Sequence, residues 1–386
     1  MKKQLTRIAS WMLLATMGQA GVFAQNIRID MNQTYPEKTI NLQKVADVKY
    51  IPLETTDEVL FNGIVTNLSA EGIAGFNKKE GDILVFDGTG KAIASFNHMG
   101  QGPNEYNKIY HLDVDWKQKE VYVQDNFRQK IRIYGLDGRH LRTIDLQETM
   151  QQGDLYSFSD TRLIYYAQPK SKPVTAYEPV TLLSKKDASK VTLPFTKTDD
   201  NLVKATGGPF GDMKMSAKNV NLLCKKGDEV YVNEVTADVI YRVESNHALT
   251  PVVERTPSYQ DASGQDFFLM LTGANARYYF FKRQQALLEF QGNAATDTKS
   301  TYVAYDRKEK QLLNPTFTNE DYPSQDIPMS KLLQCAGSAN RCYLQLEAFK
   351  LKEALAEGKL KGTLKSIAEK LDEEDNPVLM VVEFKK

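Results

Sequence analysis

A strand–turn–strand segment that recurs along the chain constrains the fold more than any other feature of the sequence. Residues Val85–Phe96 (VFDGTGKAIASF) and Ile133–Ile144 (IYGLDGRHLRTI) share an apolar–aromatic pair, a glycine-containing turn, a basic residue and a second alternating strand. Weaker copies follow at Ile240–Val253 and Thr301–Leu313. Alternation on both sides of such a turn indicates a β-hairpin. The sequence therefore predicts related hairpins along most of its length.

The repeating unit is larger than one hairpin. The sequence Glu-Val-Tyr-Val occurs just before two of the hairpins, at Glu120–Val123 and Glu229–Val232. The unit thus contains three or four strands and recurs roughly every 50 residues, which is typical of a β-propeller. A chain of 386 residues accommodates six such blades, or seven shorter ones. The alternative is a pair of β-sandwiches, but the repeat persists along the whole chain, so we predict an all-β, six-bladed propeller.

The C-terminal region has a different pattern. Residues 349–372 are predicted to be helical, with Gly358 separating two short helices, and residues 377–385 are predicted to form an apolar strand. The helical region carries an apolar stripe at helical spacing. The stripe consists of Leu360, Leu364, Ile367 and Leu371. We expect this small helical element to pack on one propeller face, with a membrane-binding helix as the alternative. We expect the last strand to close the ring with a strand near Val45–Leu53.

The N-terminus has the pattern of a secretory signal peptide. A basic start is followed by the apolar run Ile8–Ala15 and by Val22–Ala24, whose ends fit the small-residue cleavage rule. The basic residues are Lys2, Lys3 and Arg7. We therefore predict a signal peptide at residues 1–24 and a mature propeller at residues 25–386, with an uncleaved anchor as the alternative. No later segment reaches about 18 consecutive apolar residues, so we expect no membrane span after cleavage.

The charge and the positions of the cysteines limit which partners and which form of membrane attachment are expected. The chain has 49 basic and 49 acidic residues, and loss of the signal peptide leaves a slightly acidic protein, which is a poor candidate for binding nucleic acid. The cysteine nearest the cleavage region is Cys224, so we predict no lipid anchor. Cys335 and Cys342 are close in sequence and can pair in an oxidising compartment. Two buried thiols are the alternative, because nothing in the sequence fixes their geometry.

Motifs of known catalytic sites do not occur in the sequence. There is no His-Glu-x-x-His, no Gly-x-Ser-x-Gly, no Walker-type phosphate loop and no Cys-x-x-Cys. Of the four histidines, His98 and His111 flank a glycine-rich loop, whereas His140 and His247 follow hairpin turns and are expected to be solvated. We accordingly expect no metal and no cofactor.

The glycine-rich loop is the best candidate for a binding site. It combines two glycines, a proline and an adjacent acidic and aromatic residue, and backbone without side chains can approach a ligand closely. The candidate ligand-binding residues in it are His98, Gly100, Gln101, Gly102, Asn104, Glu105 and Tyr106. The alternative is a linker between blades, in which the glycines allow a sharp turn.

A second group of candidates follows the loop. The segment Leu112-Asp113-Val114-Asp115 reads as an inner strand, and alternation would point both carboxylates to one face. With His111 they are candidates for binding a ligand, either a cation or the hydroxyl groups of a sugar. The alternative is that the two carboxylates accept hydrogen bonds from neighbouring backbone amides.

Several segments together resemble a known family. They are Tyr50–Thr55 (YIPLET), Phe86-Asp87 with Gly90-Lys91, Gly100–Tyr106 (GQGPNEY) and Asp375–Leu379 (DNPVL). The chain resembles the six-bladed β-propellers of Bacteroidetes with NHL-like blades, long catalogued as a domain of unknown function. The resemblance implies the fold and export. Two departures are the absence of the lipobox cysteine of many members and Asn104 where the family often has glycine.

These observations predict an exported, non-catalytic binding or scaffolding propeller, a monomer in the periplasm or at the cell surface. The partner is expected to be an envelope protein, a peptide or a glycan. The alternative is a propeller enzyme, a lyase or hydrolase that uses a metal or carboxylates in the central funnel. The family resemblance alone suggests a third possibility, a structural adaptor beside a nutrient-uptake system.

Overall fold

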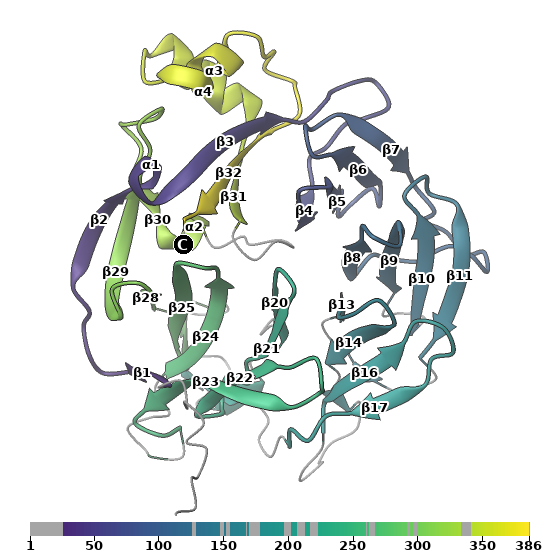
Figure 1. The fold of residues 1–386 in the computed structure, drawn as a ribbon, viewed down its shortest axis with the longest axis vertical. Coiled ribbons are helices and arrows are strands. Elements are labelled where there is room, and N and C mark those ends of the chain that lie inside the picture. Colours follow the sequence, from purple (N-terminus) through teal and green to yellow (C-terminus); the bar gives the residue numbers. More distant parts are fainter. Residues whose placement is uncertain are drawn as a thin grey trace, which may run out of the picture.

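Six antiparallel sheets surround a central axis in the computed structural model (Figure 1). The structure describes residues 26–125, 129–146, 150–151, 155–166, 168–169, 178–196, 202–206, 213–216, 223–259, 261, 267–291, 294–295, 299–332 and 341–385. The predicted six-bladed propeller is confirmed. The signal-peptide prediction and Cys335 lie outside the described residues.

The blades follow one another around the ring, and the first strand of each lies nearest the central axis. Blade 1 contains β4 (Ile64–Leu68), β5 (Gly72–Phe76), β6 (Ile83–Asp87) and β7 (Ala92–Phe96). Blade 2 contains β8 (His111–Asp115), β9 (Glu120–Asp125), β10 (Lys130–Gly135) and β11 (His140–Asp145). Blade 3 contains β13 (Leu155–Ser157), β14 (Arg162–Tyr166), β16 (Val180–Ser184) and β17 (Lys190–Thr192).

Three further blades complete the ring, and the strands of blade 5 are on average the longest among the described residues. Blade 4 contains β20 (Leu223–Lys226), β21 (Glu229–Val232), β22 (Val239–Val243) and β23 (Leu249–Thr256). Blade 5 contains β24 (Phe267–Ala274), β25 (Tyr278–Gln285), β28 (Ser300–Asp306) and β29 (Gln311–Thr318). Blade 6 contains β31 (Arg341–Leu346), β32 (Val378–Phe384) and β3 (Ala46–Pro52). The hairpins predicted from the sequence repeat are the two outer strands of blades 1, 2, 4 and 5.

The N-terminal segment runs along the outside of three blades before the chain enters blade 1 (Figure 1). Strand β1 (Ile27–Asp30) pairs in parallel with β23 of blade 4, and β2 (Glu37–Asn41) pairs in parallel with β29 of blade 5. The short helix α1 (Leu42–Val45) then leads into β3, which pairs antiparallel with β32. The predicted closure of the first and last strands is confirmed, and it leaves no open edge between blade 6 and the rest of the ring.

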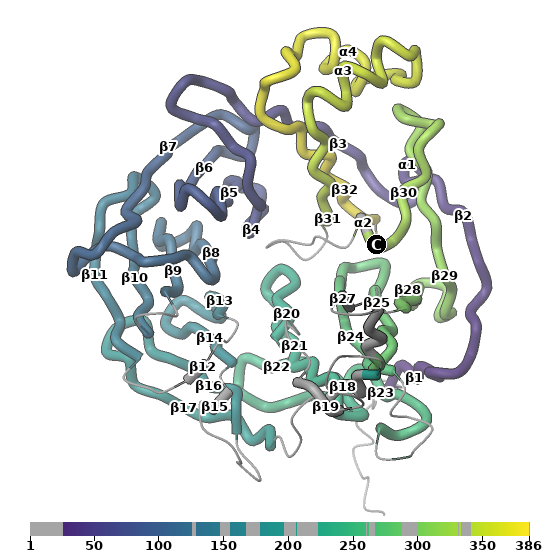
Figure 2. Tube along the Cα trace, turned by 180° about the vertical axis from the view of Figure 1, so that it is seen from behind, coloured from purple at the N-terminus to yellow at the C-terminus, as the bar shows by residue number. Residues whose placement is uncertain are grey.

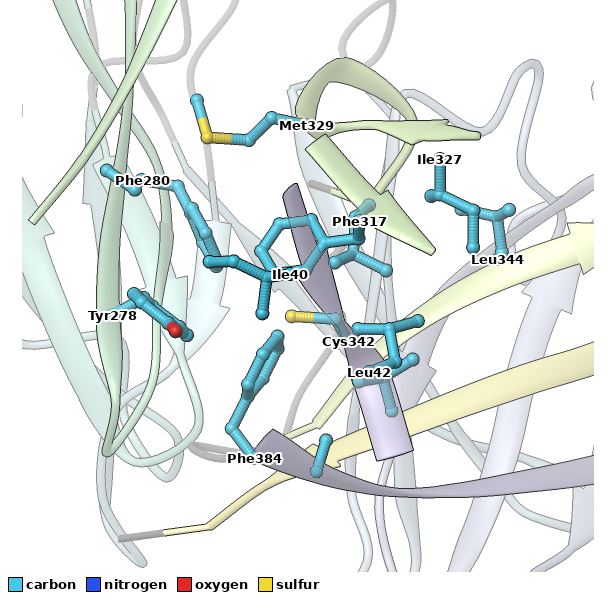
Figure 3. Close-up of a cluster of buried hydrophobic side chains, with 14 of the residues drawn as sticks. Ile40, Leu42, Tyr278, Phe280, Phe317, Ile327, Met329, Cys342, Leu344 and Phe384 are labelled. Carbon is cyan, nitrogen blue, oxygen red and sulfur yellow. The ribbon is translucent and has the colours of Figure 1, made fainter. Parts of the chain in front are cut away.

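Residues from both ends of the chain share one core. Figure 3 shows Ile40 and Leu42 of the N-terminal segment beside Phe384 of the last strand and Tyr278 and Phe280 of blade 5. All of these side chains are buried in the same cluster. Burial of apolar area is the main favourable term in folding. This cluster therefore stabilises the closure in addition to the backbone pairing of β3 with β32.

The predicted helical element is present between the two inner strands of blade 6. Helices α3 (Ala348–Ala356) and α4 (Gly362–Ala368) are separated at Gly358, whose φ is 67°. They lie at the outer edge of blade 6 rather than over a face of the ring (Figures 1 and 2). The predicted stripe packs inward, because Leu364 and Leu371 are buried together with Val378 of β32.

Four additional segments extend the ring. They are the hairpin β18 (Leu202–Thr206) and β19 (Met213–Ser216), the hairpin β26 (Leu287–Gln291) and β27 (Ala294–Ala295), the pair β12 (Met150–Gln151) and β15 (Gln168–Pro169), and β30 (Ile327–Pro328) with α2 (Met329–Leu332). Residues 201–215 contain glycine and no strand signal, so the sequence alone predicts a loop there; this prediction is wrong for β18 and most of β19. Strand β18 pairs in parallel with β26, which is inserted between β25 and β28 of blade 5 and is a distant partner that no local pattern reveals.

Candidate binding cavity

A cavity of about 1060 Å³ lies where the inner strands of all six blades meet. Each blade contributes at least one residue to its wall. Examples, from blade 1 to blade 6, are Thr66, His111, Tyr156, Lys225, Met270 and Tyr343. The cavity also reaches Lys350 and Leu351 of α3. Its volume is slightly above the usual range for small-molecule sites, which is about 300–1,000 Å³.

Bulges shape two of the inner strands that form the wall. Strand β4 carries one extra residue at Thr66, and β24 carries one at Thr272. A bulge redirects the side chain of the extra residue and commonly occurs beside functional sites. Thr272 donates its hydroxyl to the carbonyl of Phe280 at 3.1 Å, whereas Oγ1 of Thr66 is buried and has no hydrogen-bond partner among the described residues.

Asp113 of blade 2 bonds to residues of three other blades at the cavity wall. Its Oδ1 accepts a hydrogen bond from Nδ2 of Asn67 at 2.8 Å, and its Oδ2 accepts from the backbone N–H of Ser157 at 2.6 Å and from Nζ of Lys225 at 2.9 Å. Burial alone would raise the pKa of Asp113, but Lys225 and the Ser157 amide outweigh it and lower the pKa. The carboxylate is therefore charged, and both of its oxygens accept hydrogen bonds.

Asp115 forms a second ion pair two residues further along β8. Its Oδ2 lies 2.6 Å from Nζ of Lys185 and 3.4 Å from Oγ of Ser157, and Lys185 also donates to that Oγ at 2.9 Å. Both carboxylates reach Ser157 of blade 3, so they point to one face of the strand, as the alternation predicted. One of the partners is a backbone amide, which was the alternative to ligand binding. The ligand-binding role of both aspartates stays a prediction.

His111 lies at the cavity with its ring edge-to-face against Tyr156, the centroids being 4.8 Å apart. Burial lowers the pKa of His111 to about 4, Asp113 opposes this change and Lys225 adds to it. The imidazole is therefore neutral at pH 7. The packing on Tyr156 places it between blades 2 and 3.

On the opposite side of the cavity, a lysine forms no ion pair with a carboxylate of the described residues. Lys282 on β25 is half-buried, and its Nζ donates to Oε1 of Gln284 at 2.8 Å. Burial lowers the pKa of Lys282, and no neighbouring charge offsets that effect. Strand register places Lys282 between Met270 of β24 and Tyr302 of β28, and all three line the cavity.

The glycine-rich loop lies elsewhere. It runs from β7, the outer strand of blade 1, to β8, the inner strand of blade 2, which is the path of a linker between blades. Its polar groups bond within the loop and to neighbouring hairpins. Residues 98–106 do not line the cavity.

Individual contacts account for most of the loop candidates. Oε2 of Glu105 accepts from the N–H of Gly102 at 2.6 Å, and a Cβ on Gly100 would collide with the same oxygen. The hydroxyl of Tyr106 donates to the carbonyl of Gly81 at 2.7 Å. Three further contacts complete the loop: Nε2 of His98 lies 2.8 Å from the Gly138 carbonyl, the Asn104 carbonyl accepts from Tyr134, and Nε2 of Gln101 donates to Asn107. Ligand binding by the loop stays a prediction.

Metal and thiol candidates are limited. Within the described part of the chain, no three His, Cys, Asp or Glu side chains are grouped so that they could hold a metal ion. Cys342 is fully buried on β31, with its Sγ 3.9 Å from Nδ2 of Asn275. Pairing with Cys335 stays a prediction.

Over the same described residues, no helix is long and apolar enough to cross a membrane.

Sequence reasoning missed Lys225, Lys282, Thr66 and Thr272. One signal was available for Lys282, which interrupts the aromatic strand YYFFKRQQ. Alternation places it on the same face as Tyr278 and Phe280, where an apolar residue is expected. No local signal marks Lys225, because its partner Asp113 is 112 positions away.

These features define the class: a six-bladed β-propeller with a central cavity of small-molecule size. The ring is closed, the N-terminal strands β1 and β2 pair with its outer strands, and every blade lines the cavity. The chain belongs to the family described as a domain of unknown function, DUF4934, which matches residues 26–383. No curated protein matches the chain.

Two solved structures share the fold. The "Putative exported protein" of Bacteroides fragilis NCTC 9343 is 15% identical, with a TM-score of 0.60, over 93% of this chain and 99% of that one. A member of the DUF4221 family from Bacteroides vulgatus is 9% identical, with a TM-score of 0.51, over 89% of this chain and 98% of that one. Identities this low establish the fold and nothing about a ligand.

Proposed function

We propose that this protein is an exported, non-catalytic binding propeller whose ligand occupies the central cavity. The observation that carries the proposal is the cavity of about 1060 Å³ to which all six blades contribute. Its wall combines aromatic and aliphatic surface with many polar and charged side chains, which can orient a ligand by hydrogen bonds and charge. Export is supported by the signal-peptide pattern of residues 1–24 and by the name of the Bacteroides fragilis structure.

The state of the titratable groups supports binding over catalysis. A general base must be able to take a proton from the substrate, so its acceptor atoms need to be available. Asp113 and Asp115 instead hold buried lysines and backbone or hydroxyl donors, in pairs at 2.9 and 2.6 Å. Contacts of this kind link blades, and the same residues serve the scaffold of a binding protein.

The test starts from purified residues 25–386 and a thermal-shift screen of glycans, peptides and small metabolites. Compounds that stabilise the protein are then titrated against Met270→Trp, which fills the cavity at a half-buried position. Met99→Trp is the matched control, because Met99 lies in the glycine-rich loop and is 45% exposed. We expect Met270→Trp to abolish binding and Met99→Trp to leave it unchanged.

The reverse result would place the ligand at the loop and overturn the proposal. Mass spectrometry of the recovered ligand provides a second criterion. Unchanged ligand is expected, whereas conversion to a product, or a stoichiometric metal in elemental analysis, would favour the enzyme alternative.

A further inference from the structure

The charges on the cavity wall are unevenly balanced. The whole chain has equal numbers of basic and acidic residues, but lysines outnumber carboxylates in the wall. The wall lysines are Lys225, Lys226, Lys282 and Lys350, and the wall carboxylates are Asp113 and Glu347. Low-dielectric walls concentrate the field of such charges, so the cavity favours an anionic occupant.

The lysines differ in how their charge is compensated. Lys225 of the wall and Lys185 of blade 3 are each within 2.9 Å of an aspartate, with side chains only 12% and 4% exposed. Lys282 is half-buried, yet its polar contact among the described residues is the neutral amide oxygen of Gln284. Burying an ammonium group without a counter-charge is unfavourable, and buried charges in folded proteins are normally paired.

The surroundings of Lys282 suit the acidic end of a ligand. Tyr302 lies directly across from Lys282 on β28, and both line the cavity. Directly opposed residues in antiparallel strands have Cβ atoms about 5 Å apart, so a tyrosine hydroxyl and an ammonium group can approach the same acceptor. Met270 on the other side of Lys282 supplies apolar surface next to this polar pair.

We propose that the cavity binds a small carboxylate-bearing ligand, whose carboxylate pairs with Lys282 beside Tyr302. This inference rests on the proposed function and adds the chemical class of the ligand. A carboxylate supplies the missing counter-charge, and charge-assisted hydrogen bonds are about twice as strong as neutral ones. The carboxylate can belong to an acidic sugar or to a peptide, and the test separates these two sources.

The experiment compares each acid with its uncharged counterpart by calorimetry. The first pair is trigalacturonic acid and its methyl ester, and the second is the tripeptide Ala-Ala-Glu and its diamide. In the wild type, we expect the acid of one pair to bind at least tenfold more tightly than its neutral counterpart. The pair that shows the preference identifies the source of the carboxylate.

Variants then test the role of Lys282. We expect Lys282→Gln to reduce the acid-over-neutral ratio to near one, and Lys282→Arg to keep it above one. Lys186→Gln removes the same charge from an exposed turn in blade 3 and is expected to leave the ratio unchanged. Circular dichroism and denaturant unfolding confirm that each variant is folded.

The outcomes distinguish this inference from the proposed function. Equal affinity for acid and neutral counterpart in the wild type, or an unchanged ratio in Lys282→Gln, overturns the carboxylate assignment. If Met270→Trp still abolishes that binding, the cavity remains the ligand site. Binding of inorganic phosphate in preference to both acids, lost in Lys282→Gln, also overturns the carboxylate assignment. If no compound binds in the cavity, both proposals fail.

Discussion

The two sides of the cavity differ in whether their buried charges are paired. On the side of blades 2 to 4, Asp113 and Asp115 are matched with Lys225 and Lys185, and each aspartate has further donors. On the side of blades 5 and 6, Lys282 faces the cavity and, within the described part of the chain, bonds to the neutral amide of Gln284 rather than to a carboxylate. The paired aspartates and lysines hold neighbouring blades in position, whereas an unpaired lysine can still bind an anionic group of a ligand. We therefore infer that the first side belongs to the scaffold and the second to the ligand site.

The largest effect is expected from Asp113→Ala on the paired side. The change leaves Lys225, the Asn67 amide and the Ser157 N–H without their acceptor. Breaking a buried ion pair from one side costs about 3–5 kcal/mol. We expect the free energy of unfolding, measured in urea, to fall by about that amount.

Asp57→Ala is the control for this experiment, because Asp57 is exposed in a turn. It is expected to change the free energy of unfolding by less than about 0.5 kcal/mol. A loss of similar size in both variants would contradict the assignment of Asp113 to the scaffold.

Elements formed by residues close in sequence could be predicted, whereas pairings between distant residues could not. The hairpins, such as β6 with β7, are encoded locally by alternation and a glycine turn, so the repeat revealed them. Strand β1 pairs with β23, with Ile27 opposite Val253, and no pattern within its four residues indicates that partner. The position of β1 on the outside of the ring depends on tertiary contacts alone.

The site was harder to predict than the fold for a related reason. His111 and Asp113 were found because they lie on an inner strand next to a conspicuous loop. The cavity, however, assembles one strand from each blade, and residues such as Lys225 and Met270 are apart in sequence by tens of positions. The glycine-rich loop attracted attention by its composition, yet its glycines accommodate the carboxylate of Glu105.

The next effect concerns pH and His111. Its pKa in the folded protein is about 4, below the unfolded value of about 6.5, so the unfolded state binds more protons between these values. Stability from this group is present above about pH 6.5 and is lost as the pH falls toward 4. We expect a loss of about 2–3 kcal/mol in the free energy of unfolding between pH 7 and pH 4.

The variant His111→Gln isolates that contribution. Burial also lowers the pKa of His140, but His140 is present in both proteins, so it cancels in the difference. We expect the loss of stability between pH 7 and pH 4 to be smaller in the variant by about 2–3 kcal/mol. Parallel pH profiles would show that His111 is hydrated rather than packed against Tyr156.

A smaller effect, of opposite sign, is expected on the unpaired side. Lys282→Met removes an uncompensated charge and leaves an apolar chain beside Met270, so the ligand-free protein should gain about 1 kcal/mol in the free energy of unfolding. The matched substitution Lys225→Met should lower it, because Asp113 loses its counter-charge. Denaturant unfolding of both proteins gives the two signs, and a loss of stability in Lys282→Met would remove the distinction between the two sides.

The smallest effect is expected outside the cavity, in the glycine-rich loop. Glu105→Gln keeps an oxygen acceptor for the N–H of Gly102 but removes its charge, and the group is only partly buried. We therefore expect a loss of about 0.5–1 kcal/mol in the free energy of unfolding and no change in ligand affinity. The same ligand titrations provide the measurement. Weaker binding with unchanged stability would mean that Glu105 contacts the ligand, and the loop would then belong to the site. Unchanged binding with reduced stability would assign the Glu105 carboxylate to the linker between blades 1 and 2, as its contact with Gly102 indicates.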